Sequence, residues 1–192
     1  MADDEDRTDP RTVSTDKKIT AAALALLREG GPQRVNIEAV SAASGVAKTS
    51  IYRRYANSLE MLEGALEQAV STYSPQRPSA PASWDEGLAE ALHFLLQDMG
   101  IGVAVSLLSE PDSESSRILR EHLVRPRVER LRELFAAETA AGRLSPELDV
   151  EVVLDFVLGS AYSHVARHGS LGEDWPRRVH RTLTGVLAAH RP

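Results

Sequence analysis

Apolar residues recur at helical spacing along most of the chain, and Gly and Pro separate the apolar segments. Residues 16–29 carry one apolar stripe, and Gly30-Gly31-Pro32 then stops the helix that this stripe predicts. No segment alternates polar and apolar residues for long enough to indicate a strand. The pattern therefore predicts an all-α protein.

Two short helices and a longer one are expected next. Asn36 is a suitable N-cap for the second helix, and Ser44-Gly45-Val46 can form a tight turn after it. The third helix, residues 47–54, has only Ile51 clearly apolar on its inner side, so most of its surface must face something polar. The pair Asn57-Ser58 begins the fourth helix.

A proline-rich segment, SPQRPSAPAS at residues 74–83, indicates a linker. The helical pattern restarts at Ser83 and Glu86, which form a capping box. The remaining helices are expected near residues 88–99, 101–109, 113–122, 126–141, 149–168 and 175–189. The expected architecture is an N-terminal three-helix head, joined by a helix to a C-terminal helical bundle.

The composition of the 192 residues narrows the possible classes of protein. Hydrophobic residues make up 42% and aromatic residues 5%, so Ala, Leu and Val must form most of the core. The absence of cysteine excludes disulfides, thiol catalysis, Cys-ligated zinc and iron–sulfur clusters. No run of about eighteen apolar residues occurs, and the acidic N-terminus does not match a signal peptide. We therefore expect a cytoplasmic protein with no membrane span.

Charge is unevenly distributed, although the net charge is −6. Residues 1–10 contain five acidic side chains and one arginine, whereas residues 11–58 contain eight basic side chains and three acidic ones. A cationic module on an acidic body is typical of a DNA-binding protein with a second function elsewhere. Ordinary variation in surface charge is the alternative interpretation.

Residues 35–62 meet the requirements of a helix-turn-helix, whose second helix enters the major groove by its N-terminal end. Gly45 permits the turn, while Val46 and Ile51 anchor the third helix and leave its polar side chains outward. These side chains can contact bases or phosphates, and the start of the helix at Asn36 offers backbone N–H groups to a phosphate. The candidate DNA-binding residues are Asn36, Lys48, Thr49, Ser50, Tyr52, Arg53 and Arg54.

The segment SGVAKTSIYRRY at residues 44–55, preceded by Asn36-Ile37-Glu38, resembles the TetR/AcrR-type bacterial transcriptional regulators over roughly residues 16–66. The resemblance implies that Tyr55 closes the motif and that DNA faces the side chains of Lys48, Thr49, Ser50, Tyr52 and Arg53. Family members usually place a lysine at the start of the fourth helix, where this chain has Ser58 and then Leu59. Either Arg53 or Arg54 compensates, or the affinity for DNA is lower than usual.

Residues 127–169 resemble the sensor domains of one subset of that family. The resemblance implies that the helices at 149–168 and 175–189 form a four-helix dimer interface. Both helices carry apolar faces, and Gly159 with Ser160 allows close helix approach. The candidate interface residues are Val153, Val157, Ser160, Leu183, Val186 and Leu187. Packing of these faces inside one subunit is the alternative.

An effector pocket would use large or adaptable side chains of the central helices. The candidates are Trp84, His93, Phe94, Met99, Phe156 and Tyr162, each of which could equally belong to the core. Gly100 and Gly102 would end the fifth helix, either as a hinge that relays occupancy or as a C-cap. No charge cluster suggests a phosphate or a metal, so the expected effector is an apolar or amphipathic organic molecule.

Signatures of enzymes are weak. His164 and His168 stand one helical turn apart, but Val165 replaces the glutamate that zinc proteases need. Gly100-Ile101-Gly102 lacks the third glycine of a dinucleotide fingerprint, and no Ser-His-Asp or Gly-x-Ser-x-Gly arrangement occurs. We therefore expect no enzyme activity, no cofactor and no metal.

The sequence thus predicts a DNA-binding transcriptional regulator, expected to be a homodimeric repressor that a small organic effector releases from a palindromic operator in double-stranded DNA. Its expected parts are a disordered acidic tail at 1–13, a helix-turn-helix domain at 14–58, a connecting helix and linker at 59–82, and a ligand-binding and dimerisation domain at 83–192. The alternative is an all-α interaction module that keeps the fold but binds DNA weakly or not at all.

Overall fold

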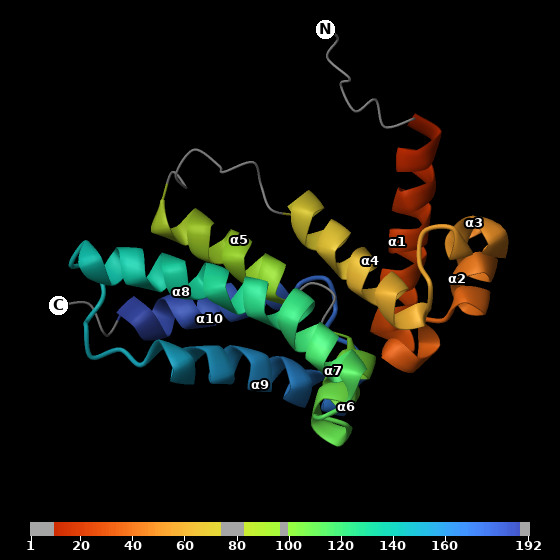
Figure 1. The fold of residues 1–192 in the computed structure, drawn as a ribbon. Helices are drawn as coiled ribbons and strands as arrows, with labels where there is room; N and C mark the ends of the chain where they lie inside the picture. Colours follow the sequence, from red (N-terminus) through yellow and green to blue (C-terminus); the bar gives the residue numbers. More distant parts are fainter. Residues whose placement is uncertain (1–9, 74–82, 97–99, 189–192) are drawn as a thin grey trace, which may run out of the picture.

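The computed structural model describes residues 10–73, 83–96 and 100–188, and all regular elements within them are helical, which confirms the all-α prediction (Figure 1). The α-helices are α1 (Pro10–Gly30), α2 (Ile37–Ser44), α3 (Lys48–Tyr52), α4 (Ser58–Tyr73), α5 (Trp84–Leu96), α6 (Ile101–Ser109), α7 (Glu114–Ile118), α8 (Arg125–Ala140), α9 (Val150–His168) and α10 (Trp175–Ala188). A 3₁₀ turn, η1 (Pro32–Arg34), and a π-helical turn, η2 (Leu119–Val124), complete the set.

The N-terminal helices begin and end where local chemistry allows. The first helix starts at Pro10, earlier than the predicted residue 16. Proline is tolerated in the first turn of a helix, because the N–H groups there have no carbonyl partner within the helix. Asn36 caps α2, since its Oδ1 accepts a hydrogen bond of 2.9 Å from the Ala39 N–H. Gly45 ends α2 with a φ of 71°, a left-handed conformation that suits glycine. The predicted turn between α2 and α3 is therefore present.

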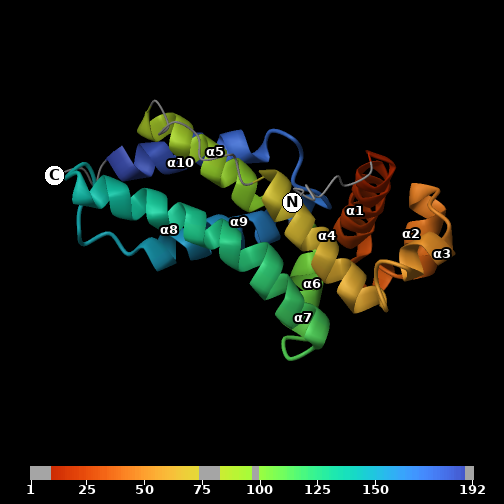
Figure 2. The ribbon, with the colours of Figure 1, turned by 45° about the horizontal axis from the view of Figure 1, so that its top comes forward.

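The head and the adjoining helices share one hydrophobic core. Buried residues from α1 to α4 pack together with Val103 of α6, Ile118 of α7, and Leu119 and Leu123 of η2. Figures 1 and 2 show α4 running from the α2–α3 end toward the body of the molecule, with α6 and α7 below α1 and α4. The head is therefore seated on the C-terminal half through apolar side chains.

A second core holds the rest of the C-terminal half. Helices α5, α8, α9 and α10 enclose buried residues that include Leu92, Leu131, Phe135 and Leu154. The capping box predicted for α5 is present in part, since the Glu86 N–H donates to Ser83 Oγ over 3.2 Å. This core forms the elongated body seen opposite the head in both ribbon views.

The path from α7 to α8 differs from the sequence prediction. Two separate helices were expected at 113–122 and 126–141, but the chain stays helical from Glu114 to Ala140. Pro126 lacks an N–H and its ring crowds the preceding turn, which ordinarily breaks a helix. The π-helical turn η2, immediately before this proline, absorbs the misfit by a local change of pitch. The expected break was therefore wrong.

Backbone meets backbone where α1 ends and α6 begins. Gly100 is the N-cap of α6, and α5 is described as far as Leu96, so the expectation that Gly100 is a C-cap of α5 was wrong. A Cβ atom added to Gly102 would overlap the backbone nitrogen of Gly31, and one on Gly100 would overlap the Arg28 carbonyl oxygen. Glycine is required at these positions because the two main chains touch.

No helix among the described residues is long and apolar enough to cross a membrane. The expected linker at 74–82 and residues 1–9 of the expected tail lie outside the described residues, whereas residues 10–13 belong to α1.

Candidate nucleic-acid interface

One buried side chain holds α3 in place while its neighbours face solvent. Ile51 is completely buried in the head core, whereas Lys48, Thr49 and Arg53 are exposed and Tyr52 is 54% exposed. Ser50 is half-buried. The helix is only five residues long, so its outward face presents a compact polar surface with an aromatic ring at its edge.

Charges at the start of α2 and α3 are paired with each other. Lys48 Nζ lies 3.2 Å from Glu38 Oε1, and both side chains are more than half exposed. The pKa of the Glu38 carboxyl lies below its usual range, first because a backbone N–H donates to it and then because Lys48 is close. An exposed pair of this kind is weak, so a phosphate can displace Glu38 from the lysine.

Arg54 points back into the head. Its Nε lies 2.5 Å from Asp16 Oδ1 of α1, and its Nη1 donates over 3.0 Å to the carbonyl oxygen of Ser50. Both side chains of the ion pair are less than a third exposed. Arg54 thus links α3 to α1, and among the two neighbouring arginines only Arg53 is exposed.

The start of α4 is built from its own side chains. Asn57 Oδ1 accepts from the Glu60 N–H over 3.0 Å, and the Glu60 carboxylate accepts from the Ala56 N–H over 2.6 Å. The bond to Asn57 is one half of a capping box, whereas Glu60 accepts from the residue before Asn57 rather than from Asn57 itself. The Asn-x-x-Glu spacing was available in the sequence, although the prediction named only the first two positions. Ser58, which stands where family members usually have a lysine, is half-buried. The charged residue nearest to it in the sequence is Glu60, which is negative.

Tyr55 lies partly inside the head. Its ring packs against the shared core and beside Gly64, where an added Cβ would lie 2.8 Å from the tyrosine Cε1. Burial raises the pKa of the Tyr55 hydroxyl above its usual range. The residue thus fixes the passage from α3 to α4, in agreement with a position that closes the motif.

The five candidate effector residues that the structure describes lie in different surroundings. Trp84 stacks edge-to-face on Phe135 at 5.4 Å, while Phe94 lies under the Arg127 guanidinium at 4.8 Å. Tyr162 packs against the shared core, and burial raises the pKa of its hydroxyl. His93 is exposed, Phe156 is 71% exposed, and Met99 lies outside the described residues.

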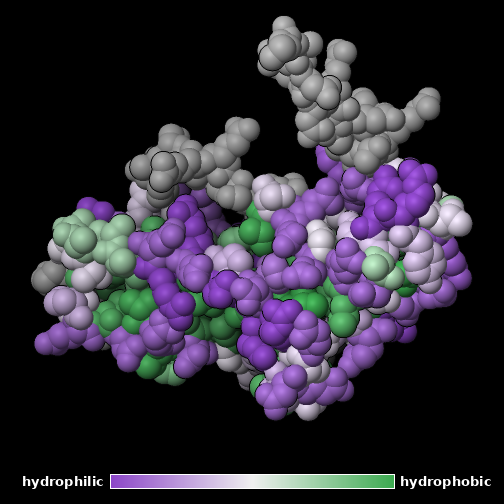
Figure 3. Space-filling view, in the orientation of Figure 1, coloured by the Kyte–Doolittle hydropathy of each residue, from purple (hydrophilic) through white to green (hydrophobic). Residues whose placement is uncertain are grey.

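A cleft of about 350 Å³ opens elsewhere, between the η2–α8 segment and α9. Its floor is apolar and its rim is charged, with a lining of Arg120, Glu121, Val124, Arg125, Val128, Arg132, Glu151, Leu154, Asp155 and Leu158. Figure 3 shows apolar surface between polar side chains along the band that α8 and α9 occupy in Figure 1. Sequence spacing gave no sign of this cleft, because the periodicity within each helix does not show how two helices pack against each other.

The candidate dimer residues divide between the core and the surface. Val157 and Leu187 are buried inside this chain, so these two are not available to a partner, while Val153, Ser160 and Leu183 are half-buried and Val186 is 54% exposed. Exposed apolar side chains on α9 are instead Val152 and Phe156, with Gly159 exposed on the next turn. Among the described residues of one chain, nothing apolar covers this outer face of α9.

Comparison with known proteins agrees with the fold and the head. A family model described as the tetracyclin repressor-like C-terminal domain matches residues 85–183, and one described as bacterial regulatory proteins of the tetR family matches residues 19–65. No curated protein matches the chain.

Several solved structures share the whole architecture. The fatty acid degradation regulator FadR from Bacillus halodurans is 19% identical, with a TM-score of 0.65 over 92% of this chain and 96% of its own. FadR from Bacillus subtilis, solved in complex with stearoyl-CoA, is 18% identical, with a TM-score of 0.63 over 90% and 97% of the two chains. A TetR-family regulator from Cytophaga hutchinsonii is 14% identical, with a TM-score of 0.65 over 96% and 98%. The chain belongs to the TetR family of DNA-binding transcriptional regulators.

Proposed function

We propose that the chain is a homodimeric repressor that binds a palindromic operator and leaves it when a small organic effector binds the C-terminal half. The observation that supports this most directly is α3, anchored by the buried Ile51 and otherwise outward-facing and polar. A short helix held in this way can enter a major groove without disturbing the core behind it.

The proposed DNA contacts differ in kind. Lys48 and Arg53 supply charge to phosphates, Thr49 and Ser50 supply hydroxyl groups, and Tyr52 packs its ring on the sugar-phosphate backbone. Asn36 acts through the helix that it caps, whose first N–H groups bind a phosphate. Arg54 acts indirectly, because its ion pair with Asp16 holds α3 against α1.

The proposed dimer uses the outer face of α9, where Val152 and Phe156 are exposed. This interface can be extended by side chains at or near the surface of α9 and α10, namely Val153, Ser160, Leu183 and Val186. Two heads held about 34–36 Å apart would read half-sites one turn of DNA apart.

The proposed effector site is the cleft between α8 and α9. Its apolar floor, with Val124 and Val128, suits a hydrocarbon segment, and Arg120 and Arg125 at the rim suit a polar end. The B. subtilis FadR contains stearoyl-CoA, which makes long-chain acyl-CoA the first compound to test. An effector should raise the melting temperature and lower DNA affinity together. Stabilisation without a change in DNA affinity would contradict the coupling.

The second candidate function is an interaction module that binds DNA weakly. Ser58 and Glu60 favour it, because the start of α4 carries a carboxylate and no lysine for a phosphate. Selection of operator DNA by the full-length protein decides between the two functions.

The test is a selection of operator DNA with the full-length protein, followed by titration of variants on the enriched sequence. Lys48→Ala and Tyr52→Ala should each weaken binding about tenfold or more, and Lys48→Ala should lower the slope of log affinity against log salt by about one. The melting temperature should stay almost unchanged. Arg177→Ala, which removes an exposed charge from α10, is the matched control and should bind normally.

Enrichment of no sequence by a folded dimer, with and without acyl-CoA, would favour the interaction module. An equal loss in the Arg177→Ala control would show that the binding depends on overall charge rather than on α3.

A further inference from the structure

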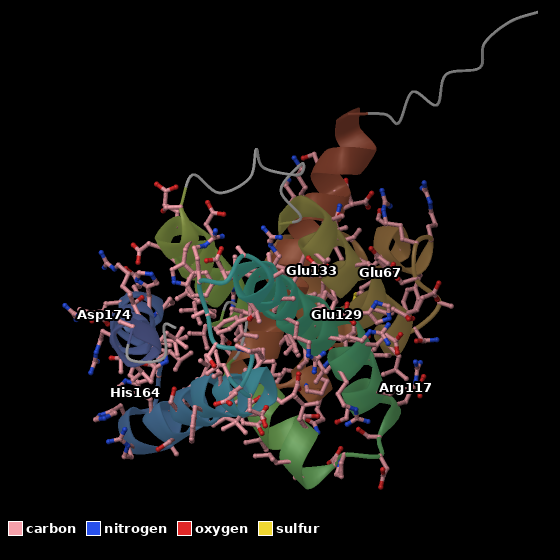
Figure 4. All side chains as sticks on the ribbon, turned by 90° about the vertical axis from the view of Figure 1, so that its left-hand side faces the viewer. Glu67, Arg117, Glu129, Glu133, His164 and Asp174 are labelled. Atoms are coloured by element: carbon pink, nitrogen blue, oxygen red, sulfur yellow. The ribbon has the colours of Figure 1, made fainter. Side chains whose placement is uncertain are left out.

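Three side chains with metal-binding groups meet where α4 crosses the π-helical turn. Glu63 and Glu67 stand one turn apart on the same face of α4, and His122 projects toward them from η2. One ligand atom from each lies within 4.8 Å of the others. Figure 4 shows Glu67 on α4 at the side of the molecule that also carries Arg117.

Each ring nitrogen of His122 faces a carboxylate. Nε2 lies 3.0 Å from Glu63 Oε1, and Nδ1 lies 3.6 Å from Glu67 Oε1, while the imidazole is only 19% exposed. A neutral imidazole has one N–H and one lone pair, so it can donate to only one of these carboxylates. The other nitrogen then directs its lone pair at a negatively charged oxygen. A cation between them removes that repulsion.

Neighbouring arginines do not take the place of such a cation. Arg117 is close enough to interact electrostatically with Glu63, but Glu114 holds its guanidinium through two hydrogen bonds of 2.6 and 3.0 Å. Arg125 donates one hydrogen bond, of 2.6 Å, to Glu121. Glu63 and Glu67 therefore direct their charge at the histidine.

The donor set suits a particular class of ion. One imidazole and two carboxylates are ligands of intermediate to hard character, which zinc, cobalt, manganese and ferrous ions accept. Bonds of about 2.0–2.1 Å in a tetrahedral site place neighbouring donor atoms about 3.3 Å apart, close to the observed 3.0 Å between Nε2 and Glu63. Glu67, the most exposed of the three, can join the ion or accept a hydrogen bond from Nδ1–H, which orients the ring.

We propose that His122 Nε2 and Glu63 bind one divalent first-row transition-metal ion, with Glu67 as a third ligand or as the acceptor that orients the ring, and water in the remaining positions. The sequence gave no indication of this site because the histidine is more than fifty residues from the glutamates. The sequence expectation of no metal rested on the absence of a charge cluster and on the i, i+4 pair His164 and His168. Figure 4 shows His164 on the opposite side of the molecule from Glu67.

A metal here would connect the two halves of the chain. Helix α4 leads out of the DNA-binding head, and η2 belongs to the C-terminal half. An ion that ties them together restricts the orientation of the head, so its occupancy should change operator affinity. This consequence rests on the proposed function, whereas metal binding itself does not.

The test is titration of the metal-free full-length protein with Co²⁺, followed by visible absorption, and with Zn²⁺, followed by calorimetry. One equivalent should bind. His122→Gln should abolish saturable binding, Glu63→Gln should weaken it at least about tenfold, and Glu67→Gln should weaken it about tenfold. His168→Gln and Glu133→Gln, which change the same residue types elsewhere on the surface, are matched controls and should bind normally. Melting temperatures without metal verify that each variant is folded.

Absence of saturable binding, or binding that survives His122→Gln, would overturn the site; in the first case the contacts of His122 with Glu63 and Glu67 have a structural role only. Loss of binding in His168→Gln would assign the ion to the histidine pair of α9 and would also overturn it. Operator titration with and without Zn²⁺ separates the two proposals. If the protein binds metal but selects no operator, the metal site is supported and the repressor function is contradicted. If it binds an operator but no metal, the repressor function is supported and the metal site is contradicted.

Discussion

At the scale of single residues, the head separates side chains that hold α3 from side chains that α3 displays. Ile51 and Arg54 face inward, one through apolar contact and the other through its ion pair with Asp16, while Arg53 between them and Tyr52 face solvent. The adjacent residues Arg53 and Arg54 therefore have different environments, so substitutions at the two positions can separate DNA binding from fold stability.

Arg54→Ala should destabilise the protein by about 1–2 kcal/mol, because it leaves the half-buried Asp16 carboxylate without its partner. Arg53→Ala should leave stability within about 0.5 kcal/mol of the parent and weaken operator binding about tenfold. Urea unfolding and operator titration of both variants measure this. Equal destabilisation by the two substitutions would show that the ion pair does not secure α3.

Local spacing was sufficient to predict Asn36 as a cap and Ile51 as an anchor, since both depend on neighbours within one turn. It could not predict that Asp16 would hold Arg54, because these residues lie 38 positions apart and meet only after α1 packs on the rest of the head. The same limit concealed His122 beside Glu63.

The histidine at the α9–α10 contact makes stability depend on pH. His164 stacks on the buried Trp175 with ring centroids 3.9 Å apart, and burial, then the charges of His168 and Arg178, lower the pKa of His164 below its usual value of about 6.5. The unfolded chain therefore takes up this proton first as the pH falls.

Stability should consequently decline as the pH drops below about 6.5 and level off below the folded-state pKa of His164. The melting temperature of His164→Gln should depend less on pH between 5 and 7 than that of the parent. His93→Gln, an exposed histidine on α5, is the control and should keep the parental slope. A slope unchanged in His164→Gln would contradict the assignment.

At the scale of helices, the sequence predicted most elements and missed how they meet. Stripes and caps located α5, α6, α9 and α10 because each is set by its own residues. The continuous α7–η2–α8 path was missed because proline ordinarily breaks a helix and the π-helical turn that accommodates it has no residue signature. The cleft between α8 and α9 was missed because helix pairing depends on the whole core.

The end of α1 and the start of α6 are in main-chain contact at Gly31 and Gly102. Gly102→Ala should destabilise the protein by about 1–3 kcal/mol, because the new methyl group overlaps the main chain at Gly31 and one helix must move. Gly185→Ala, which points into open space on α10, should instead stabilise by about 0.5–1 kcal/mol through helix propensity. Chemical denaturation measures the free energy of unfolding of both variants. A Gly102→Ala variant as stable as the parent would show that the two helices can move apart at little cost.

At the scale of the whole molecule, the uncovered face of α9 should determine the oligomeric state. Phe156→Glu should convert the proposed dimer into a monomer, because a carboxylate on an apolar interface loses its water without gaining a partner. Leu108→Glu alters a side chain of α6 that is 74% exposed, against 71% for Phe156, and should leave the dimer intact. Sedimentation measures both, and dissociation by Leu108→Glu alone would move the interface to α6.

The core that α1–α4 share with α6, α7 and η2 bears on how such regulators can be recombined. A hybrid repressor made by exchanging residues 14–73 between two homologues would replace the α1 and α4 surfaces that Val103, Ile118 and Leu123 fit, without replacing those three side chains. The exchanged segment would then pack poorly against α6, α7 and η2. The hybrid would lose the control of DNA binding by ligand even where both parents retain it. Exchanging the cognate residues of α6 and η2 together with the head should preserve the response.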